Sequence, residues 1–205
     1  MRVQCRPAGY AFWLWWVLVS TISVFVGMFF GITGLADSFP GIIMFGIMCG
    51  GVIGIAQWLV LRLYIKQVSR WILVTTLGWM IGWIVIDVVI NNYRRIMVDE
   101  WSTFIAIIVT FGAILGFVIG LMQWTVLNRR VAESIWWIIG STLSSVVGSG
   151  VGFYVAHLLS KDIIDPMLGH PVFWLSFIAV FGSIYAISTG TLLTWLMGQS
   201  KASAV

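Results

Sequence analysis

Six long apolar runs, separated by short polar segments, account for most of the 205-residue chain. They cover approximately 10–32, 40–61, 71–90, 102–127, 134–159 and 171–197. At about 1.5 Å of rise per residue, a helix made from any one of them crosses a hydrocarbon core of roughly 30 Å. The composition agrees, because 60% of the residues are hydrophobic and only 9% are charged, as in integral membrane proteins. We therefore predict an all-α polytopic membrane protein with six transmembrane helices in a single transmembrane domain.

Two motifs repeat among these runs. The even-numbered runs read Phe45-Gly46-x3-Gly50-x3-Gly54-x2-Gln57-Trp58-x2-Leu61-Arg62, then Phe111-Gly112-x3-Gly116-x3-Gly120-x2-Gln123-Trp124-x2-Leu127-Asn128, and then the degraded Phe181-Gly182-x3-Ala186-x3-Gly190. The odd-numbered runs share Trp-x3-[Ser/Thr]-Thr-x-[Ser/Gly]-x3-Gly, beginning at Trp16, Trp71 and Trp137. We predict three two-helix repeat units, at about 10–66, 67–130 and 131–200. Successive hairpins keep one orientation, which predicts a pseudo-threefold axis along the membrane normal; a pseudo-sixfold or less regular bundle is the alternative.

The glycines of these motifs have a packing explanation. Small residues at every fourth position lie along one stripe of a helix and let another backbone approach closely. We predict that the odd-helix stripes, which also include Ser23, Gly78 and Ser144, complement the even-helix stripes; a pore lining or hinge is the alternative. The predicted packing glycines are Gly46, Gly50, Gly54, Gly112, Gly116, Gly120, Gly182 and Gly190 in the even runs, and Gly27, Gly82 and Gly148 in the odd runs.

Orientation follows from the eleven Lys and Arg residues. With a cytoplasmic N-terminus, eight of them lie inside and three outside: Arg2, Arg6, Arg62, Lys66, Arg70, Arg129, Arg130 and Lys201 against Arg94, Arg95 and Lys161. This positive-inside bias predicts that both termini are cytoplasmic. We interpret the first run as a retained span, because it exceeds the apolar length of a signal peptide and matches the later odd runs. The basic residues form no continuous patch, so no nucleic-acid partner is expected.

Helix starts carry local signals. Pro40 and Pro171 are predicted at the outer starts of the second and sixth spans, where a missing amide donor costs little. Ser102 is predicted to cap the fourth span.

The Gln-Trp pairs are the strongest candidates for polar function. Gln57 and Gln123 are predicted to hydrogen-bond across helices near the cytoplasmic boundary, with Trp58 and Trp124 as interface anchors. The alternative is a vestibule in which both amides recognise a polar substrate. The third unit has Leu193 and Thr194 at the matching places, which weakens a symmetric substrate ring. Arg62, which becomes Asn128 in the second copy, is interpreted as a snorkelling contact to lipid phosphate.

Thirteen of the 205 residues are Trp. Six of them lie near the inner ends of odd runs and are interpreted as an aromatic belt: Trp13, Trp15, Trp16, Trp71, Trp136 and Trp137. Trp79, Trp83 and Trp174 fit a belt less well. They suggest contact with a lipid, a quinone, a carotenoid, a chlorophyll-type pigment or a neighbouring transmembrane subunit.

Titratable candidates are few. Asp87 lies about 16 residues beyond Trp71, close to the outer boundary, and is interpreted as an interfacial acid with proton or cation handling as the alternative. His157 and His170 also lie toward the outside. Ordinary interfacial roles are preferred for them over ligation of a haem or chlorophyll, because facing His pairs are absent from the pattern.

Enzymatic chemistry finds no support in the sequence. The chain has no HExxH, Walker A or CxxC motif and no paired carboxylates, so we predict no enzyme, no catalytic residue and no metal site. The Gly148-Ser149-Gly150 segment shares a helix with His157, but no oxyanion loop accompanies it. Cys5 and Cys49 lie at different depths, which argues against a disulfide.

The Gln-Trp-x2-Leu-Arg segment at Gln57, within Trp- and Gly-rich helices, resembles a group of six-helix bacterial membrane proteins that includes proteins from phototrophic bacteria. The resemblance covers Trp16 to about Trp195. It implies a multi-pass protein of the bacterial cytoplasmic (inner) membrane or a derived photosynthetic membrane, and it implies no particular activity. Mitochondrial carriers also have three two-helix repeats, but their Pro-x-[Asp/Glu]-x2-[Lys/Arg] motif is absent here.

Three functions are consistent with these patterns. The preferred hypothesis is a non-enzymatic accessory or scaffold subunit that packs among lipids and other transmembrane subunits of a larger complex, for example an energy-transducing or photosynthetic one. The second is a small-solute or ion transporter or channel, and the third is a lipid- or pigment-binding protein. Few polar groups lie at membrane depth, which favours the first over a transport path.

Overall fold

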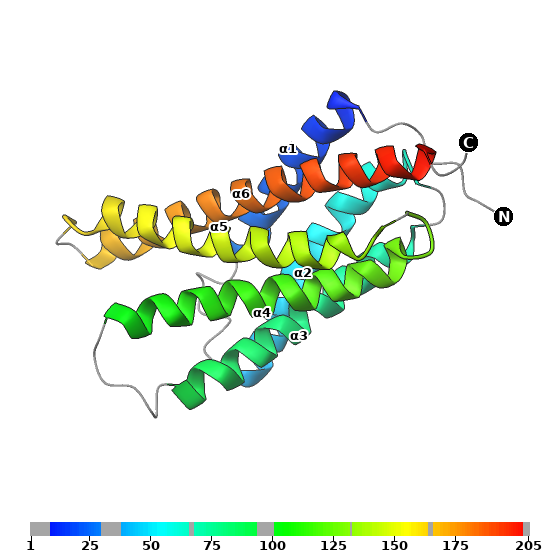
Figure 1. The fold of residues 1–205 in the computed structure, drawn as a ribbon. Helices are drawn as coiled ribbons and strands as arrows, with labels where there is room; N and C mark the ends of the chain where they lie inside the picture. The colour runs from blue at the N-terminus through cyan, green and yellow to red at the C-terminus, as the bar shows by residue number, and fades with distance from the viewer. Residues whose placement is uncertain are drawn as a thin grey trace.

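The computed structural model describes residues 9–29, 38–65, 68–93, 101–131, 133–163 and 166–202. These contain six helices (Figure 1), namely α1 Tyr10–Phe29, α2 Phe39–Leu61, α3 Arg70–Tyr93, α4 Trp101–Leu127, α5 Trp136–Ser160 and α6 Pro166–Ala202. Each includes a segment long and apolar enough to cross a membrane. The predicted all-α fold with six candidate spans is therefore confirmed.

Two of the predicted helix starts are wrong. Helix α4 begins at Trp101, so Ser102 lies inside the helix and cannot be its N-cap. Helix α6 begins at Pro166, which takes the first-turn place favoured by proline, and Pro171 lies within the helix. Pro40 does lie in the first turn of α2. The N-cap there is Ser38, whose Oγ accepts a hydrogen bond of 3.2 Å from the Gly41 amide.

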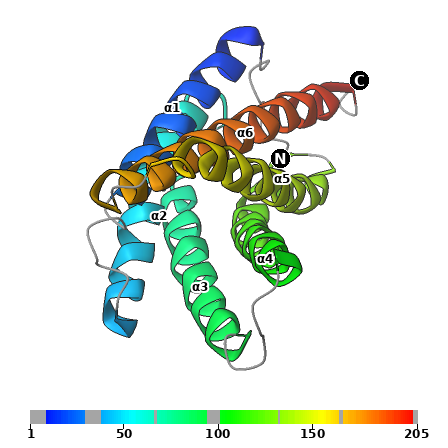
Figure 2. The same cartoon turned by 90° about the vertical axis from the view of Figure 1, so that its left-hand side faces the viewer.

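The helices form a closed ring. Each packs on its neighbours in the chain, and α6 returns to pack on α1, as the end view in Figure 2 shows. Helix α1 begins and α6 ends at the end of the bundle that carries the α2–α3 and α4–α5 connections (Figure 1). We call this the short-loop end and the other the far end. We call the α1–α2, α3–α4 and α5–α6 contacts hairpins, and the α2–α3, α4–α5 and α6–α1 contacts seams.

The even-helix glycines lie at the seams. A Cβ added to Gly50 would lie 2.6 Å from the Thr76 Cα on α3, and one added to Gly116 would lie 2.6 Å from the Ser141 carbonyl oxygen on α5. At the third seam, Gly190 faces the Trp16 ring on α1. The remaining predicted even-helix glycines also meet the helix across their own seam: Gly46, Gly54, Gly112, Gly120 and Gly182. These positions let neighbouring helices approach closely.

The odd-helix small residues lie at the hairpins instead. Gly27 faces the backbone of Cys49, with its added Cβ 3.2 Å from the Cys49 Cα. In the same way, Gly78 and Gly82 face α4, and Gly148 faces Phe181 of α6. The two sets of small residues therefore serve different interfaces, and the expected complementarity between them is wrong. One helix has two neighbours in a ring, so each helix needs two separate contact faces.

Two apolar clusters of buried side chains lie within the bundle. The cluster at the short-loop end includes Phe12, Trp16, Trp71, Trp137 and Leu193. The second, farther from that end, includes Phe45, Trp79, Leu115, Ile119 and Phe181. The interior of the described bundle is thus packed with aliphatic and aromatic groups from all six helices.

Candidate functional site

Three tryptophans at the same position of the odd-run motif meet inside the bundle. Trp16, Trp71 and Trp137 are each fully buried, with 0% exposure. Their ring centroids are 6.0 to 6.3 Å apart, and each pair meets edge to face at interplanar angles of 63° to 80°, a favoured aromatic geometry. We call this group the tryptophan triad. The belt interpretation is wrong for these three residues.

The triad donates its indole N–H groups to polar side chains on the even helices. Trp71 Nε1 donates to Gln57 Oε1 at 3.1 Å, and Trp137 Nε1 donates to Gln123 Oε1 at 3.1 Å. Trp16 Nε1 donates to Thr189 Oγ1 at 3.2 Å. Each bond crosses a seam. A buried indole N–H needs such an acceptor, because an unpaired donor at this depth loses the hydrogen bonds that water would supply.

The two glutamines also bind each other and the odd helices of their own hairpins. Gln123 Nε2 donates to Gln57 Oε1 at 3.3 Å and to Thr75 Oγ1 at 3.0 Å. Gln57 Nε2 donates to Ser20 Oγ at 3.4 Å. Both amides are 1% exposed. The triad, the amides and these hydroxyls form one network that we call the polar ring, and it supplies the cross-helix bonds expected of the glutamines.

Helix α6 departs from this pattern. The place of Gln57 and Gln123 is taken by Leu193, which is buried in the short-loop cluster. Trp16 therefore finds its acceptor one helical turn earlier, at Thr189. Ser141, the counterpart of Ser20 and Thr75, is fully buried and its Oγ makes no hydrogen bond of ordinary length and angle, although the Tyr185 phenol lies beside it. The loss of one amide thus affects both the seam and the hairpin that it would serve.

The polar ring is chemically neutral. Its members are indoles, carboxamides and hydroxyls, none of which gains or loses a charge near neutral pH. Gln57 and Gln123 each make three hydrogen bonds, so most of their donors and acceptors are occupied by other members. This arrangement suits cross-helix attachment better than capture of a polar substrate, which would need free donors or acceptors facing an open cavity.

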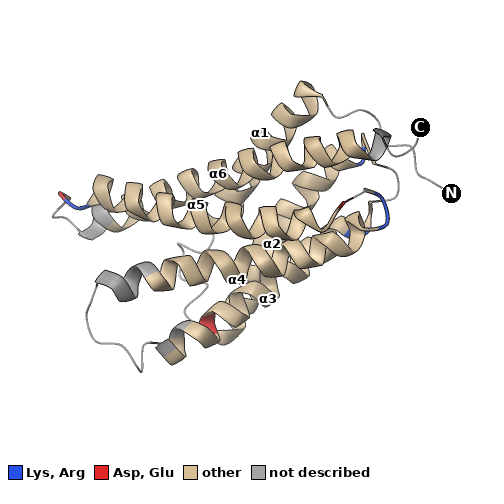
Figure 3. Ribbon diagram, viewed as in Figure 1, with Lys and Arg blue, Asp and Glu red and all other residues tan. Residues whose placement is uncertain are grey.

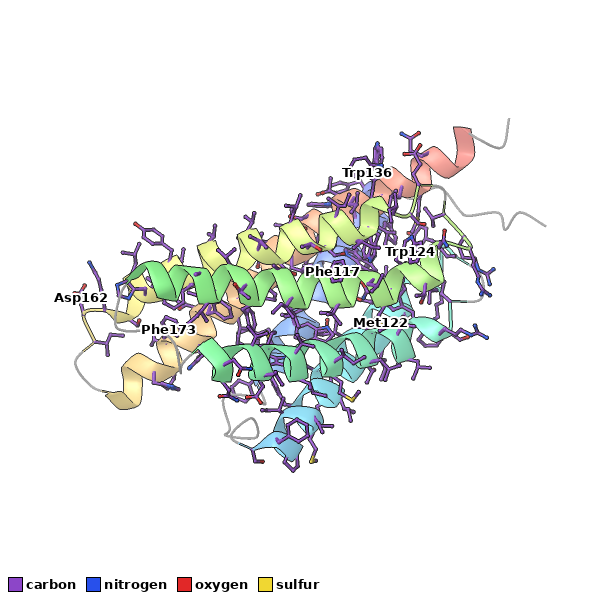
Figure 4. All side chains as sticks on the ribbon, turned by 60° about the horizontal axis from the view of Figure 1, so that its bottom comes forward. Phe117, Met122, Trp124, Trp136, Asp162 and Phe173 are labelled. Carbon is purple, nitrogen blue, oxygen red and sulfur yellow. The ribbon has the colours of Figure 1, made fainter. Side chains whose placement is uncertain are left out.

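The residues predicted to anchor the interface lie outside the ring. Arg62 is exposed, and its guanidinium carbon lies 4.8 Å from the centre of the Trp58 ring, a cation–π contact. Trp124 is half-buried, and its Nε1 is buried without a hydrogen-bond partner. Trp15 and Trp136 are 60% and 48% exposed, which fits the belt interpretation for these two. Figure 4 shows Trp124 and Trp136 toward the short-loop end, with Asp162 at the opposite end.

The titratable candidates lie away from the polar ring, toward the far end. Asp87 accepts a hydrogen bond of 3.0 Å from Asn91 Nδ2, one turn later on α3. His157 stacks on Phe153 with a 10° angle between the rings. His170 Nε2 accepts a hydrogen bond of 3.1 Å from Trp174 Nε1. Each imidazole contacts an aromatic ring one turn away on its own helix, and these contacts bring neither of them to Asp87.

The residues considered for metal binding or nucleophilic chemistry lie apart or bind backbone carbonyls. The described residues contain no group of three His, Cys, Asp or Glu side chains able to hold a metal ion. Ser149 Oγ donates to the carbonyls of Ile108 and Val146, at 3.1 and 3.0 Å. Cys49 is buried, and its Sγ donates to the Gly27 carbonyl at 2.9 Å. Cys5 lies outside the described residues.

The outer surface of the bundle is apolar. Figure 3 shows that the charged residues of the described part of the chain lie near the ends of the helices and leave most of each span without charge. Phe117 and Leu143 are 50% and 59% exposed. A shallow groove of about 280 Å³ runs between α5 and α6, lined by Gly140, Leu143, Ser144, Val147, Ser188 and Leu192. Of the tryptophans suggested to contact a ligand, Trp174 is 38% exposed but Trp79 is buried against the α2 glycines.

Sequence reasoning missed the triad and the role of Ser20, Thr75 and Thr189. A signal was present for Ser20 and Thr75, since all three copies of the odd-run motif place a Ser or Thr four residues after the motif tryptophan, one turn along the same face. Thr189 gave no such signal, because it does not occupy the position equivalent to the glutamines.

Comparison with protein-family models, with curated proteins and with solved structures finds no match to this chain.

Proposed function

We propose that this chain is a non-enzymatic accessory or scaffold subunit, which packs through its apolar outer surface against other transmembrane subunits of a larger membrane complex. The observation that carries the proposal is the polar ring. The buried amides and indoles bind one another, so the polar groups at this depth of the membrane hold helices together. The surface left for recognition is the outer one.

The packing of the interior supports the same proposal. A transport path needs polar groups along a continuous route across the membrane. Here the triad lies at the centre of the short-loop cluster, and the second cluster of buried apolar side chains lies beyond it. A transporter would have to open both clusters, so we rank transport second. Pigment or lipid binding ranks third, because His157 and His170 each contact an aromatic ring one turn away on their own helix.

The proposal includes the repeat organisation and the topology. We propose three two-helix repeats around a pseudo-threefold axis that passes through the tryptophan triad. Equivalent residues of the three units meeting edge to face support this axis. Described cations at the short-loop end, Arg62, Arg70, Arg129 and Arg130, support a cytoplasmic location for that end. We place the chain in the bacterial inner membrane or a derived photosynthetic membrane, in keeping with the resemblance stated above.

The test is purification of the tagged chain from its native membrane in a mild detergent, with identification of co-purifying subunits and an absorption spectrum of the product. We expect a transmembrane partner in fixed stoichiometry. A free monomer from several detergents would contradict the proposal, and bound pigment without a partner would favour the third function. Flux in reconstituted vesicles provides the transport arm of the test. Solute-selective flux from the purified monomer would favour the second function.

A further inference from the structure

The three seams are joined by different polar groups. At α2–α3 and α4–α5, an indole N–H is bound by a glutamine that is itself linked to other helices. At α6–α1, both indole bonds end on threonine hydroxyls: Trp16 on Thr189 at 3.2 Å and Trp13 on Thr191 at 3.0 Å. Each threonine hydroxyl also donates to a carbonyl of α6 itself. The third seam therefore lacks a connection that extends from α6 to the rest of the polar ring.

Helix α1 also makes the least extensive contacts in the ring. At 20 residues it is the shortest of the six described helices, and it packs less extensively on α2 and on α6 than the other neighbouring helices pack on each other. Figures 1 and 2 both show its first turns leaning away from the other helices, and Tyr10 is 75% exposed. Its bond to the glutamines, from Gln57 to Ser20, is the longest in the polar ring at 3.4 Å.

We propose that the ring opens at α1: this helix separates from α6 and α2, while α2 to α5 stay joined through Gln57 and Gln123. Opening exposes the inner faces of α2 and α6 laterally to the lipid. The proposal rests on the comparison of seams and does not depend on the proposed function.

Cys49 is a natural reporter of this motion. Its thiol is fully buried between α1 and α2, so a membrane-permeant maleimide reaches it only when these helices part. In a Cys5→Ser background it is the single thiol, since the chain has two cysteines. A matched reporter is Ser149→Cys with Cys49→Ser. This position is also fully buried, and its side chain donates to a carbonyl across the α4–α5 seam.

In lipid vesicles under native conditions, we expect the Cys49 reporter to be labelled about tenfold or more faster than the matched reporter, because local opening is cheaper than global unfolding. Equal rates would overturn the proposal, because both thiols would then be exposed by one global event. A Cys49 rate below that of the matched reporter would overturn it as well.

A disulfide lock gives a second, independent readout. A Cβ added at Gly182 lies 3.3 Å from the Val24 Cβ across α6–α1, near the spacing of a disulfide. The control pair is Gly120 and Ser141 across α4–α5, at 3.0 Å. Oxidised Val24→Cys/Gly182→Cys should slow Cys49 labelling about tenfold, reversibly on reduction, and Gly120→Cys/Ser141→Cys should not. If both locks slow labelling equally, or neither does, the opening at α1 is refuted; should a lock variant fail to fold, the two reporter rates decide alone.

Discussion

Helices α2 and α4 pack against the next odd helix with different chemistry from α6. In α2 and α4, a buried glutamine accepts a hydrogen bond from the tryptophan across the seam and donates one to a hydroxyl of its own hairpin. In α6, Leu193 fills the equivalent place, and Trp16 donates to Thr189. The triad keeps its edge-to-face geometry nonetheless. We infer that aromatic and glycine packing sets the arrangement of the helices, while the amides determine how firmly each seam is held.

The largest expected effect comes from filling a glycine at a tight seam. A Cβ at Gly116 would lie 2.6 Å from a backbone oxygen and 2.7 Å from the Ser145 Cβ, whereas a Cβ at Gly182 would meet the Val24 side chain at 3.1 Å. We expect Gly116→Ala to lower the free energy of unfolding by about 3 kcal/mol, because the backbone of α5 would have to move. Gly182→Ala should lower it by about 1 kcal/mol or less, because the Val24 side chain can shift instead. Denaturant unfolding in detergent, followed by circular dichroism, measures both. Gly116→Leu should yield no folded monomer, and equal costs for the two alanine variants would show that the seams are equally tight.

Removing an amide should have the next largest effect. Gln123→Leu gives α4 the residue that α6 carries at the equivalent position and removes three hydrogen bonds, leaving Trp137 Nε1 without its acceptor. At about 0.6 kcal/mol for a hydrogen bond in a membrane, we expect a loss of roughly 2 kcal/mol. Thr189→Val, the control at the third seam, should cost about a third of that. A reversed order, measured by the same unfolding assay, would show that amides are not the stronger connection.

Placing an amide at the equivalent position of α6 should change the stability in the opposite direction. Leu193→Gln puts a carboxamide of similar volume at the position that hydrogen-bonds across the hairpin in α2 and α4, where we expect it to bind the Ser141 hydroxyl. Trp16 already donates to Thr189, so we expect a gain of about 0.6 kcal/mol from one new hydrogen bond of membrane strength. Leu193→Met keeps the volume without the amide and should give no gain.

A double-mutant cycle isolates the new bond to Ser141. In the Leu193→Gln background, Ser141→Ala should remove most of the gain, whereas in the native background it should be close to neutral because the Ser141 Oγ makes no hydrogen bond of ordinary length and angle. Additive effects would mean that the amide introduced by Leu193→Gln does not bind Ser141.

The number of helices and their approximate positions were largely predictable from the sequence. The side chains that fill the interior were not. The number and the length of the apolar runs can be read directly from the sequence, which is why six helices could be predicted. The sequence of a run does not show which face of its helix is directed toward the interior. Trp15 and Trp16 are neighbours at one depth, yet they differ by about 100° around the helix, and one is 60% exposed while the other is buried. An aromatic belt and an aromatic core therefore look alike in sequence until the copies are compared position by position.

The candidate site divides in the same way. Gln57 and Gln123 were identified because both copies of the motif carry them. Thr189 was not identified, because it takes the acceptor role of the glutamines from a position one helical turn before their equivalent, Leu193. That replacement depends on the distance between α6 and Trp16, which only the three-dimensional packing supplies. The helix starts at Trp101 and Pro166 were missed for a simpler reason: local capping signals compete with one another, and the sequence does not show at which of them the helix begins.

The smallest expected effect is at Asp87. Its interaction with Asn91 is a bond within one helix at an exposed position, far from the polar ring. We expect Asp87→Asn to change the unfolding free energy by less than about 0.5 kcal/mol. Replacing the carboxylate by a carboxamide is informative because it removes the charge and preserves the shape of the side chain. If vesicle flux or membrane potential dependence changed while stability did not, Asp87 would have to be handling a cation or proton. That result would favour transport over the accessory role, since a residue of a purely structural surface would affect neither measurement.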